Sequence, residues 1–238
     1  MKQDTSIEIQ RKFREYLNEE YALKSNRFFK SKKGEYGYGD IFLGIRSPII
    51  RMVAKENVHL SISDTKKLIK SKYHEERLLG LIILVNKYKK AKDESEQEQY
   101  YQIYINSFKY INNWDLVDVT CPHIIGKHLM KRDRSILYEW AQSDDLWTKR
   151  IAMITNWWFV RKGDLKDVFK IAKILLKDEH DLIHKAVGWM LREAAKKDMV
   201  AAEKFLKRHY TKMPRTMLRY AIEKFPEKKR QKYLKGLI

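Results

Sequence analysis

Residues 73–90 read YHEERLLGLIILVNKYKK, and this stretch decides the fold. Leu78, Leu81, Ile82 and Val85 recur at the spacing of one helical face. Lysines fill the last turn, where positive charge is favourable at the C-terminal end of a helix. The stretch is therefore predicted to be an amphipathic helix with its apolar face in the core.

The remaining chain repeats this pattern in shorter segments that small polar connectors separate. No segment alternates with period two over a useful length, and 9 Gly and 4 Pro in 238 residues are few for a strand-rich sandwich or barrel. The predicted fold class is therefore all-α. Further helices are expected over residues 93–110, 114–130, 146–162, 165–176, 181–196, 200–209 and 214–225.

Alternate helical segments recur at intervals typical of helix-pair repeats. Residues at similar positions in five of them lie 41, 32, 35 and 33 residues apart, namely Arg77, Asp118, Arg150, Lys185 and Leu218. Each pair in such an array buries its apolar face against its neighbours, so the pattern predicts an α-solenoid. A globular helical bundle with accidental spacing is the alternative.

The charge balance indicates a polyanionic partner. The chain carries 50 Lys and Arg against 31 Asp and Glu, a formal net charge of +19. A charge this far from zero opposes compaction and favours binding to an opposite charge. With one cysteine, Cys121, no internal disulfide is expected. The sequence shows no long apolar stretch and no apolar leader at its start, so a cytoplasmic protein without membrane association is expected.

The positions of the basic residues sharpen this expectation. Arg150 and Arg161 lie about three helical turns apart, with Trp147 one turn before Arg150. In the segment 181–196, a second stripe combines Lys185, Trp189, Arg192 and Lys196, and a separate apolar stripe faces the core. Stripes of this kind on the inner helices of a solenoid would form a concave basic surface that follows a phosphate backbone. An acidic protein or a membrane surface is the alternative partner.

Ser47 and Pro48 mark a helix start, whose free backbone N–H groups suit a phosphate oxygen. The alternative is that the pair only caps a helix. The stretch GYGDIF at 37–42 is not a nucleotide-binding glycine motif and is expected to be a loop.

Most catalytic signatures are absent, which leaves NNWDLVDVTCP at 112–122. Trp114 and Asp118 are four residues apart and share a helix face, whereas Asp115 lies near the helix start and is expected to be structural. Pro122 cannot donate a hydrogen bond and should bend the helix, turning Asp118 into a cleft. An ion pair between Asp118 and a neighbouring arginine is the alternative. Cys121 is expected in the core rather than as a nucleophile.

Five stretches together resemble the DNA alkylation repair enzymes of the AlkD type, in the order of that family and over nearly the whole chain. They are FLGIRSP at 42–48, WDLVD at 114–118, the helix with Trp147 and Arg150, AVGWMLREAAK at 186–196 and RTMLRYAIEKF at 215–225. The resemblance implies a right-handed solenoid of HEAT-like repeats, one domain over residues 1–238. It also implies a DNA glycosylase that removes N3- and N7-alkylated purines.

The resemblance also implies roles for single residues. Trp114, Asp118 and Trp189 match the catalytic positions of the family, and Arg150 and Arg192 match its DNA-backbone positions. Residues on the same basic stripes and at the helix start, Arg161, Lys185 and Ser47, are expected to add DNA contacts. A tryptophan that often precedes the WDxxD motif is Asn113 in this chain.

The expected reaction is base excision from double-stranded alkylated DNA by a monomer, with no metal and no cofactor. An alkylated purine is already cationic and leaves without a general acid, so Asp118 would stabilise the positive charge on the sugar. No lid-like segment is evident, so recognition without a tight base pocket is expected. A HEAT-like module that binds branched or damaged DNA without cleavage, and a protein-binding scaffold, are the alternatives.

Overall fold

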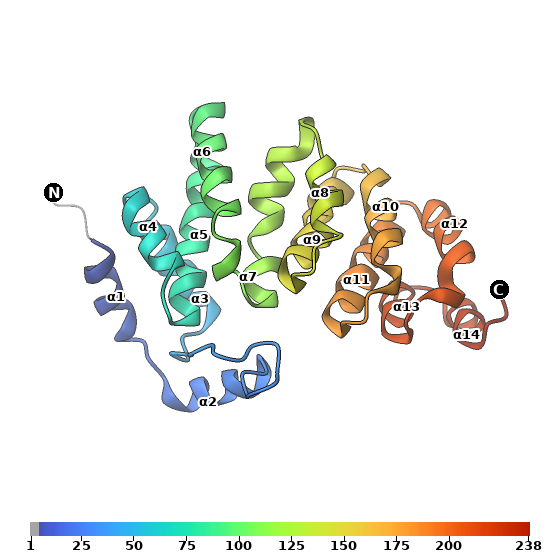
Figure 1. Cartoon of the computed structure of the whole chain (residues 1–238), viewed down its shortest axis with the longest axis horizontal. Helices are drawn as coiled ribbons and strands as arrows, with labels where there is room; N and C mark the ends of the chain where they lie inside the picture. Colours follow the sequence, from blue (N-terminus) through green and yellow to red (C-terminus); the bar gives the residue numbers. More distant parts are fainter. Residues whose placement is uncertain (1–4) are drawn as a thin grey trace. The chain divides into compact units, whose positions relative to one another are not determined.

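The computed structural model describes residues 5–238, which fold into helices joined by short connectors (Figure 1). Within these residues there is no strand, and a single isolated bridge joins Ile41 to Tyr73. The all-α prediction is confirmed, and the order of elements is compatible with a helical solenoid. None of the helices in this range is long and apolar enough to span a membrane.

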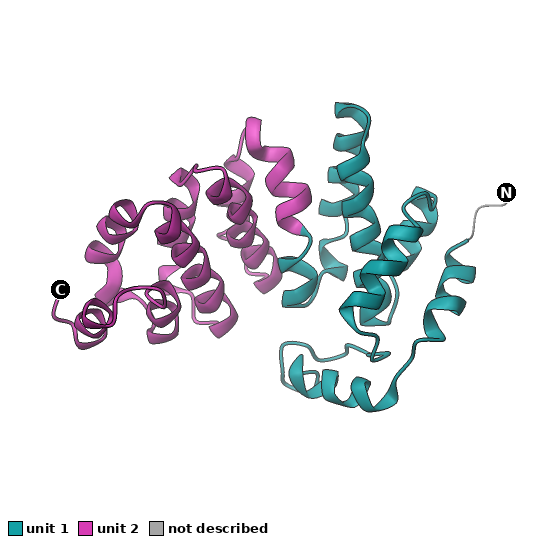
Figure 2. Ribbon diagram, turned by 180° about the vertical axis from the view of Figure 1, so that it is seen from behind, with its two compact units in different colours: residues 1–120 teal, residues 121–238 magenta. Residues whose placement is uncertain are grey.

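The chain divides into two compact units, residues 1–120 and residues 121–238 (Figure 2). The first unit contains α1 (Ser6–Arg14), α2 (Glu19–Phe28), α3 (Ser47–Glu56), α4 (Ile62–Ile69), α5 (His74–Lys90), α6 (Glu94–Ile105), η1 (Phe108–Tyr110) and α7 (Trp114–Asp118). The second contains η2 (Pro122–Gly126), η3 (Leu129–Lys131), α8 (Ser135–Trp140), α9 (Leu146–Arg161), α10 (Lys166–Ile174), η4 (Leu175–Lys177), α11 (Asp181–Lys197), α12 (Met199–His209), η5 (Tyr210–Lys212), α13 (Arg215–Ala221) and α14 (Glu227–Lys235).

Helix α5 is the centre of the first unit, because it contacts α3, α4, α6 and α7. The prediction of one apolar face is wrong for its first three turns: from His74 to Val85 every residue is buried. Gly80 permits this packing, since a Cβ at that position would lie 2.8 Å from the backbone nitrogen of Ile69 in α4. The stretch that decides the fold is thus buried on all sides over its first three turns, and its last turn carries the exposed Lys89 and Lys90.

Helix α11 has the same central place in the second unit, where it contacts α9, α10, α12 and α13. Gly188 brings α13 close, since a Cβ there would lie 2.5 Å from the carbonyl oxygen of Met217. The helices that the repeat spacing aligns are α5, α7, α9, α11 and α13. Within each unit these alternate helices contact one another: α5 with α7, and α11 with both α9 and α13.

The predicted single helix over 114–130 is wrong. Helix α7 ends at Asp118, and a wide π-helical turn begins at Pro122. Pro122 has no N–H to continue the α-helical ladder, and the hydroxyl of Thr120 is bonded to the carbonyl of Leu116 and to Tyr104. The bend expected at Pro122 is therefore a complete break, and it leaves α7 as a helix of five residues. Cys121 is buried, as expected.

Candidate functional site

Helix α7 carries Trp114 at its first position and Asp118 at its last. Residues four apart on a helix lie one above the other, so both side chains share one face. Both are half-buried, which leaves part of each side chain accessible. A helix of five residues has little stability of its own, so its position depends on bonds to the rest of the unit.

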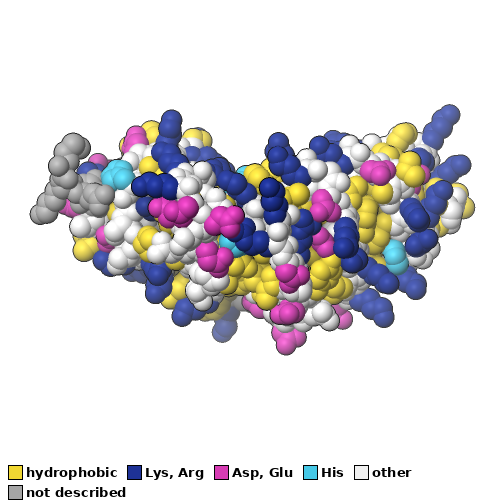
Figure 3. Space-filling model, turned by 90° about the horizontal axis from the view of Figure 1, so that it is seen from above, with side chains coloured by type: hydrophobic (Ala, Val, Ile, Leu, Met, Phe, Trp, Pro, Cys, Tyr) yellow, Lys and Arg dark blue, Asp and Glu magenta, His cyan; other side chains and the backbone are white. Residues whose placement is uncertain are grey.

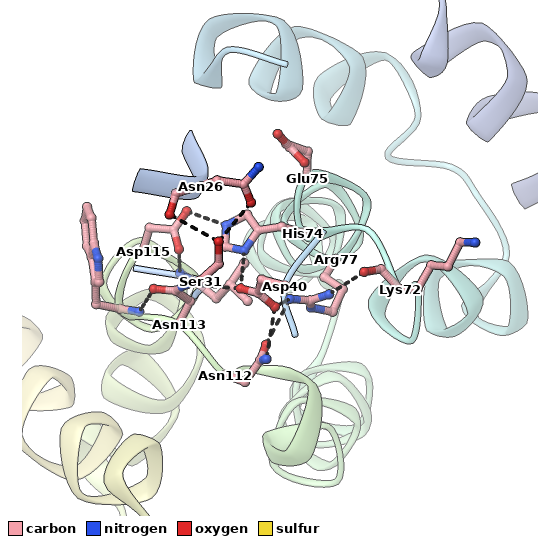
Figure 4. Close-up of polar contacts among 12 residues, drawn as sticks. Asn26, Ser31, Asp40, Lys72, His74, Glu75, Arg77, Asn112, Asn113 and Asp115 are labelled. Atoms are coloured by element: carbon pink, nitrogen blue, oxygen red, sulfur yellow. Dashed lines mark hydrogen bonds and ion pairs between the residues drawn. The ribbon is translucent and has the colours of Figure 1, made fainter. Parts of the chain in front are cut away.

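Those bonds come from a buried polar cluster, which we call the Asp40 network: Asp40, His74, Arg77, Asn112, Asn113 and Asp115 (Figure 4). Asp40 lies in the loop before α3, and its side chain is 2% exposed. Its carboxylate accepts hydrogen bonds from Arg77 Nη2 at 2.5 Å, Asn113 Nδ2 at 3.0 Å and Asn112 Nδ2 at 3.1 Å. The loop at 37–42 was expected, but its central role was not.

His74 joins Asp40 to helix α7. Its Nδ1 lies 3.0 Å from Asp40 Oδ2 and its Nε2 lies 2.9 Å from Asp115 Oδ2. Carboxylate oxygens on both sides require both ring nitrogens to donate, which is the charged imidazolium. Burial alone would lower the pKa of His74, but the carboxylates of Asp115 and Asp40 outweigh it and raise the pKa to about 9.

The same bonds hold the pKa of Asp40 low. Burial would raise it, but the hydrogen bond from His74 and the charge of Arg77 lower it to about 2. The network thus contains two carboxylates and two cations, so its charges balance inside the unit. Within residues 5–238 no group of three or more His, Cys, Asp or Glu side chains could hold a metal ion.

Asn113 and Asp115 fix the start of α7. Asn113 is fully buried, and its Oδ1 accepts the backbone N–H of Trp114 at 2.9 Å while its Nδ2 donates to Asp40. Asp115 Oδ1 accepts the N–H of Leu116 at 2.8 Å. The predicted structural role of Asp115 agrees with these bonds, which extend to His74. Asn113 thus caps the helix that holds Trp114.

Trp114 also borders a cavity of about 570 Å³ inside the first unit, which we call the aromatic cavity. Phe29 stacks on Trp114 with ring centroids 5.3 Å apart, and Phe42 stacks on Phe29 at 5.1 Å. Phe28 meets Trp114 edge-on at 5.5 Å and is 64% exposed. The sequence did not predict a cavity beside Trp114.

Trp189, Lys185 and Arg192 lie in the second unit, on α11, where the predicted division into two stripes is confirmed. The apolar stripe is at most 1% exposed, whereas Lys185, Trp189 and Arg192 are half-buried. Lys185 pairs with Asp181 at 2.7 Å, and Arg192 pairs with Glu223. Trp189 Nε1 donates to Glu193 Oε1 at 3.3 Å. These ion pairs are partly exposed to solvent.

On α9, by contrast, the predicted surface stripe is wrong at two positions. Trp147 is 9% exposed and Arg150 is 5% exposed, so both are buried. Arg150 Nη1 donates to the carbonyl of Leu182 at 2.6 Å, which joins α9 to α11. Arg161 is exposed at the end of α9, with its guanidinium 4.7 Å from the ring of Trp157. Helical spacing alone could not reveal that the guanidinium of Arg150 bonds to a backbone carbonyl.

Ser47 is exposed at the first position of α3, in the first unit. The interpretation of Ser47 as a cap is wrong, because Arg46 occupies the N-cap position and no side chain caps this helix. Glu75 positions the approach to α3 by accepting N–H bonds from Leu43, Gly44 and Ile45 at 2.9, 2.8 and 3.3 Å. Ser47 therefore lies on a loop and helix start that a buried carboxylate holds in place.

Lys and Arg side chains stand clear of the surface in Figure 3, with Asp and Glu side chains among them. A solved structure described as a predicted DNA alkylation repair enzyme from Enterococcus faecalis is similar to this chain, with a TM-score of 0.71. It is 16% identical in sequence, and the match covers 89% of this chain and 97% of that one. A likeness at this level of identity concerns the fold.

No protein of curated function matches the chain. The family model of the DNA alkylation repair enzymes matches residues 9–225, which is most of the sequence. The chain therefore belongs to the DNA alkylation repair enzyme family.

Proposed function

We propose that this protein is a DNA glycosylase of the AlkD type that removes N3- and N7-alkylated purines from double-stranded DNA. Membership of the family supports a role in DNA alkylation repair. The observation that carries the finer proposal is the placement of Trp114 and Asp118 on a five-residue helix that the Asp40 network fixes. Base excision from a cationic nucleotide needs a carboxylate and an aromatic ring on one face, and α7 presents both.

In the proposed reaction, water attacks C1′ of the deoxyribose and releases one proton to the solvent while the bond to N9 of the alkylated purine breaks. Both electrons of that bond pass to the purine and cancel its positive charge, so no general acid is required. Positive charge develops on the sugar, where the carboxylate of Asp118 stabilises it and orients the water. Trp114 and Trp189 hold the cationic nucleotide by cation–π contacts of about 0.5–2 kcal/mol each.

The DNA backbone is the proposed partner of Arg150, Arg161, Arg192, Lys185 and Ser47. The ion pairs of Lys185 with Asp181 and of Arg192 with Glu223 are partly open to solvent. Such exposed pairs contribute little stability and can be exchanged for phosphate contacts. We propose a single domain that acts as a monomer in the cytoplasm, close to the chromosomal DNA.

The test is direct detection of the released bases. Purified protein is incubated with methylated duplex DNA, and free 3-methyladenine and 7-methylguanine are measured by chromatography. We expect both bases with the natural protein and at least a tenfold loss in Asp118→Asn. Duplex affinity should be kept or raised in this variant, because a carboxylate that repels phosphate is removed.

Asp144→Asn is the matched control, since Asp144 is an exposed carboxylate in the second unit and its loss changes the net charge equally. It should release bases at the natural rate. Full activity in Asp118→Asn would overturn the catalytic assignment. Firm duplex binding without release of any base by the natural protein would instead identify a non-catalytic DNA-binding module.

A further inference from the structure

The aromatic cavity has the dimensions and walls of a ligand site. Its volume of about 570 Å³ falls within the range of about 300–1,000 Å³ typical of small-molecule pockets. It lies within the first unit, between α2, α3, α5 and α7. The buried side chains of Phe42, Ile45, Ile50 and Leu78 line it.

Flat rings make up one wall of the cavity. Trp114, Phe29 and Phe42 form a continuous stack with interplanar angles of 29° and 10°, and Phe28 closes its edge. Aromatic walls of this kind bind planar rings by stacking, whichever polar groups the ring carries at its edge. The shape and the surface therefore fit a planar heterocycle such as a nucleobase.

The charged groups of the lining offer no free carboxylate to a cationic ring. Asp115 and Glu75 are its carboxylates, but Asp115 is bonded to His74 and to the N–H of Leu116, and Glu75 takes three backbone N–H groups. Arg46 adds an exposed positive charge to the lining and His74 a buried one, whereas the charge of Lys24 is paired with Glu20 at 2.5 Å. A cation that enters would lose its hydration without gaining a free carboxylate.

We propose that the aromatic cavity binds the alkylated purine base after its release, in its neutral form. The inference rests on the proposed glycosylase function, because that reaction converts a cationic purine in the nucleotide into a neutral free base. Trp114 belongs both to the proposed catalytic face of α7 and to the cavity wall. In this proposal, the released base leaves the face of α7 with Trp114 and Asp118, which favours a cation. It then enters the aromatic cavity, which favours the neutral product.

Binding of three free bases tests the charge preference in the absence of DNA. The first is 7-methylguanine, which is neutral, and the second is 7,9-dimethylguaninium, which keeps the positive charge that the nucleotide has before cleavage. The third, 9-methylguanine, is neutral and controls for the methyl group at N9. Equilibrium dialysis or calorimetry with the full chain should show at least tenfold weaker binding of the cation than of either neutral base.

A cavity-filling variant locates the site. Ser25 is a small buried residue of α2 that lines the cavity, so Ser25→Phe should place a ring in it and weaken 7-methylguanine binding at least tenfold. Leu23→Phe is the matched control, because Leu23 lies on the same helix, is 66% exposed and is not part of the lining. It should bind the base like the natural protein. Thermal unfolding of both variants verifies that the fold is kept, and Ser25→Leu replaces Ser25→Phe if the latter does not fold.

The outcomes separate this inference from the proposed function. Equal binding of cation and neutral base, or unchanged binding in a folded cavity-filling variant, overturns the inference even if bases are released from DNA. No measurable binding of 7-methylguanine at millimolar concentration overturns it as well. Base binding that Ser25→Phe removes supports the cavity site, and it would do so even if no glycosylase activity were found.

Discussion

The two units position their proposed functional residues in opposite ways. In the first, Trp114 and Asp118 lie on a helix of five residues that polar bonds from α5 and from the loop around Asp40 hold in place. In the second, Trp189 and Arg192 lie on the 17-residue helix α11, which an apolar stripe anchors along its length. The position of α7 in the first unit depends on charge and hydrogen-bond geometry, whereas that of α11 in the second depends on the burial of apolar surface.

This contrast indicates where the molecule can tolerate change. An apolar stripe contributes through many small contacts, and the loss of one of them lowers stability moderately. A buried ionic network fails as a whole, because each missing partner leaves another charge without compensation. The proposed catalytic carboxylate is attached to the second kind of support, which gives a precise position and little tolerance.

Among these predictions, removal of Asp40 should have the largest effect on the stability of the first unit. Asp40→Ala leaves His74 and Arg77 as buried cations without their shared carboxylate, so we expect a loss of about 3–5 kcal/mol in the free energy of unfolding. Urea unfolding monitored by circular dichroism measures it. Emission of Trp114, the one tryptophan among residues 1–120, should shift in any folded fraction.

Asp164→Ala provides the control in the second unit. Asp164 pairs with Arg134 at 2.7 Å, but its side chain is 33% exposed and Arg134 keeps Asp167 at 2.6 Å. A loss of at most about 1 kcal/mol is expected there. If Asp40→Ala and Asp164→Ala lowered the free energy of unfolding equally, the Asp40 network would not be the main stabilising element of the first unit.

The charge of His74 makes the first unit sensitive to alkali. A pKa near 9 in the folded state, against 6.5 ordinarily, means that the imidazolium stabilises the fold fully below about pH 6.5. This contribution declines as the pH rises and is lost beyond pH 9, with a slope of up to about 1.4 kcal/mol per pH unit. Asp40 and Asp115 face the ring, and Arg77 and Glu75 lie next to it on α5.

Urea unfolding between pH 6 and pH 9.5 tests this dependence. We expect His74→Gln to be less stable than the natural protein at pH 6 and to lose the part of the slope that His74 contributes. His59→Gln, at an exposed histidine of the same unit, should keep the natural slope. Parallel curves for His74→Gln and the natural protein would contradict an imidazolium at this position.

The helices that the sequence predicts most accurately are those that carry their own apolar pattern. The range 146–162 became Leu146–Arg161 and the range 181–196 became Asp181–Lys197, because apolar residues at helical spacing mark such helices directly. The two stripes of α11 followed from the same spacing. The break after Asp118 was underestimated, although the proline that causes it was visible.

The Asp40 network could not be predicted from the sequence in the same way. Asp40 and His74 are 34 residues apart, His74 and Asp115 are 41 apart, and Asp40 and Asn113 are 73 apart. Only the packing of α5 against the loop and α7 brings these residues together. The sequence signal was limited to unusual polar residues, such as His74 and Arg77, at the start of the most apolar segment.

The smallest effect is expected on the salt dependence of DNA binding, from replacing Arg150 or Arg161, which lie on the same helix. Both are proposed to contact DNA, yet Arg150 is 5% exposed and bonded to Leu182, whereas Arg161 is exposed. We expect Arg161→Ala to flatten the salt dependence of duplex binding by about one charge without a change in stability. Arg150→Ala should flatten it similarly but also lower the free energy of unfolding by about 1–3 kcal/mol, because the Leu182 carbonyl loses its charged donor.

Binding titrations at several salt concentrations, with urea unfolding of the same proteins, separate the two effects. If Arg150→Ala lowers stability but leaves the salt slope unchanged, Arg150 holds α9 to α11 and Arg161 alone remains as the proposed phosphate contact on α9.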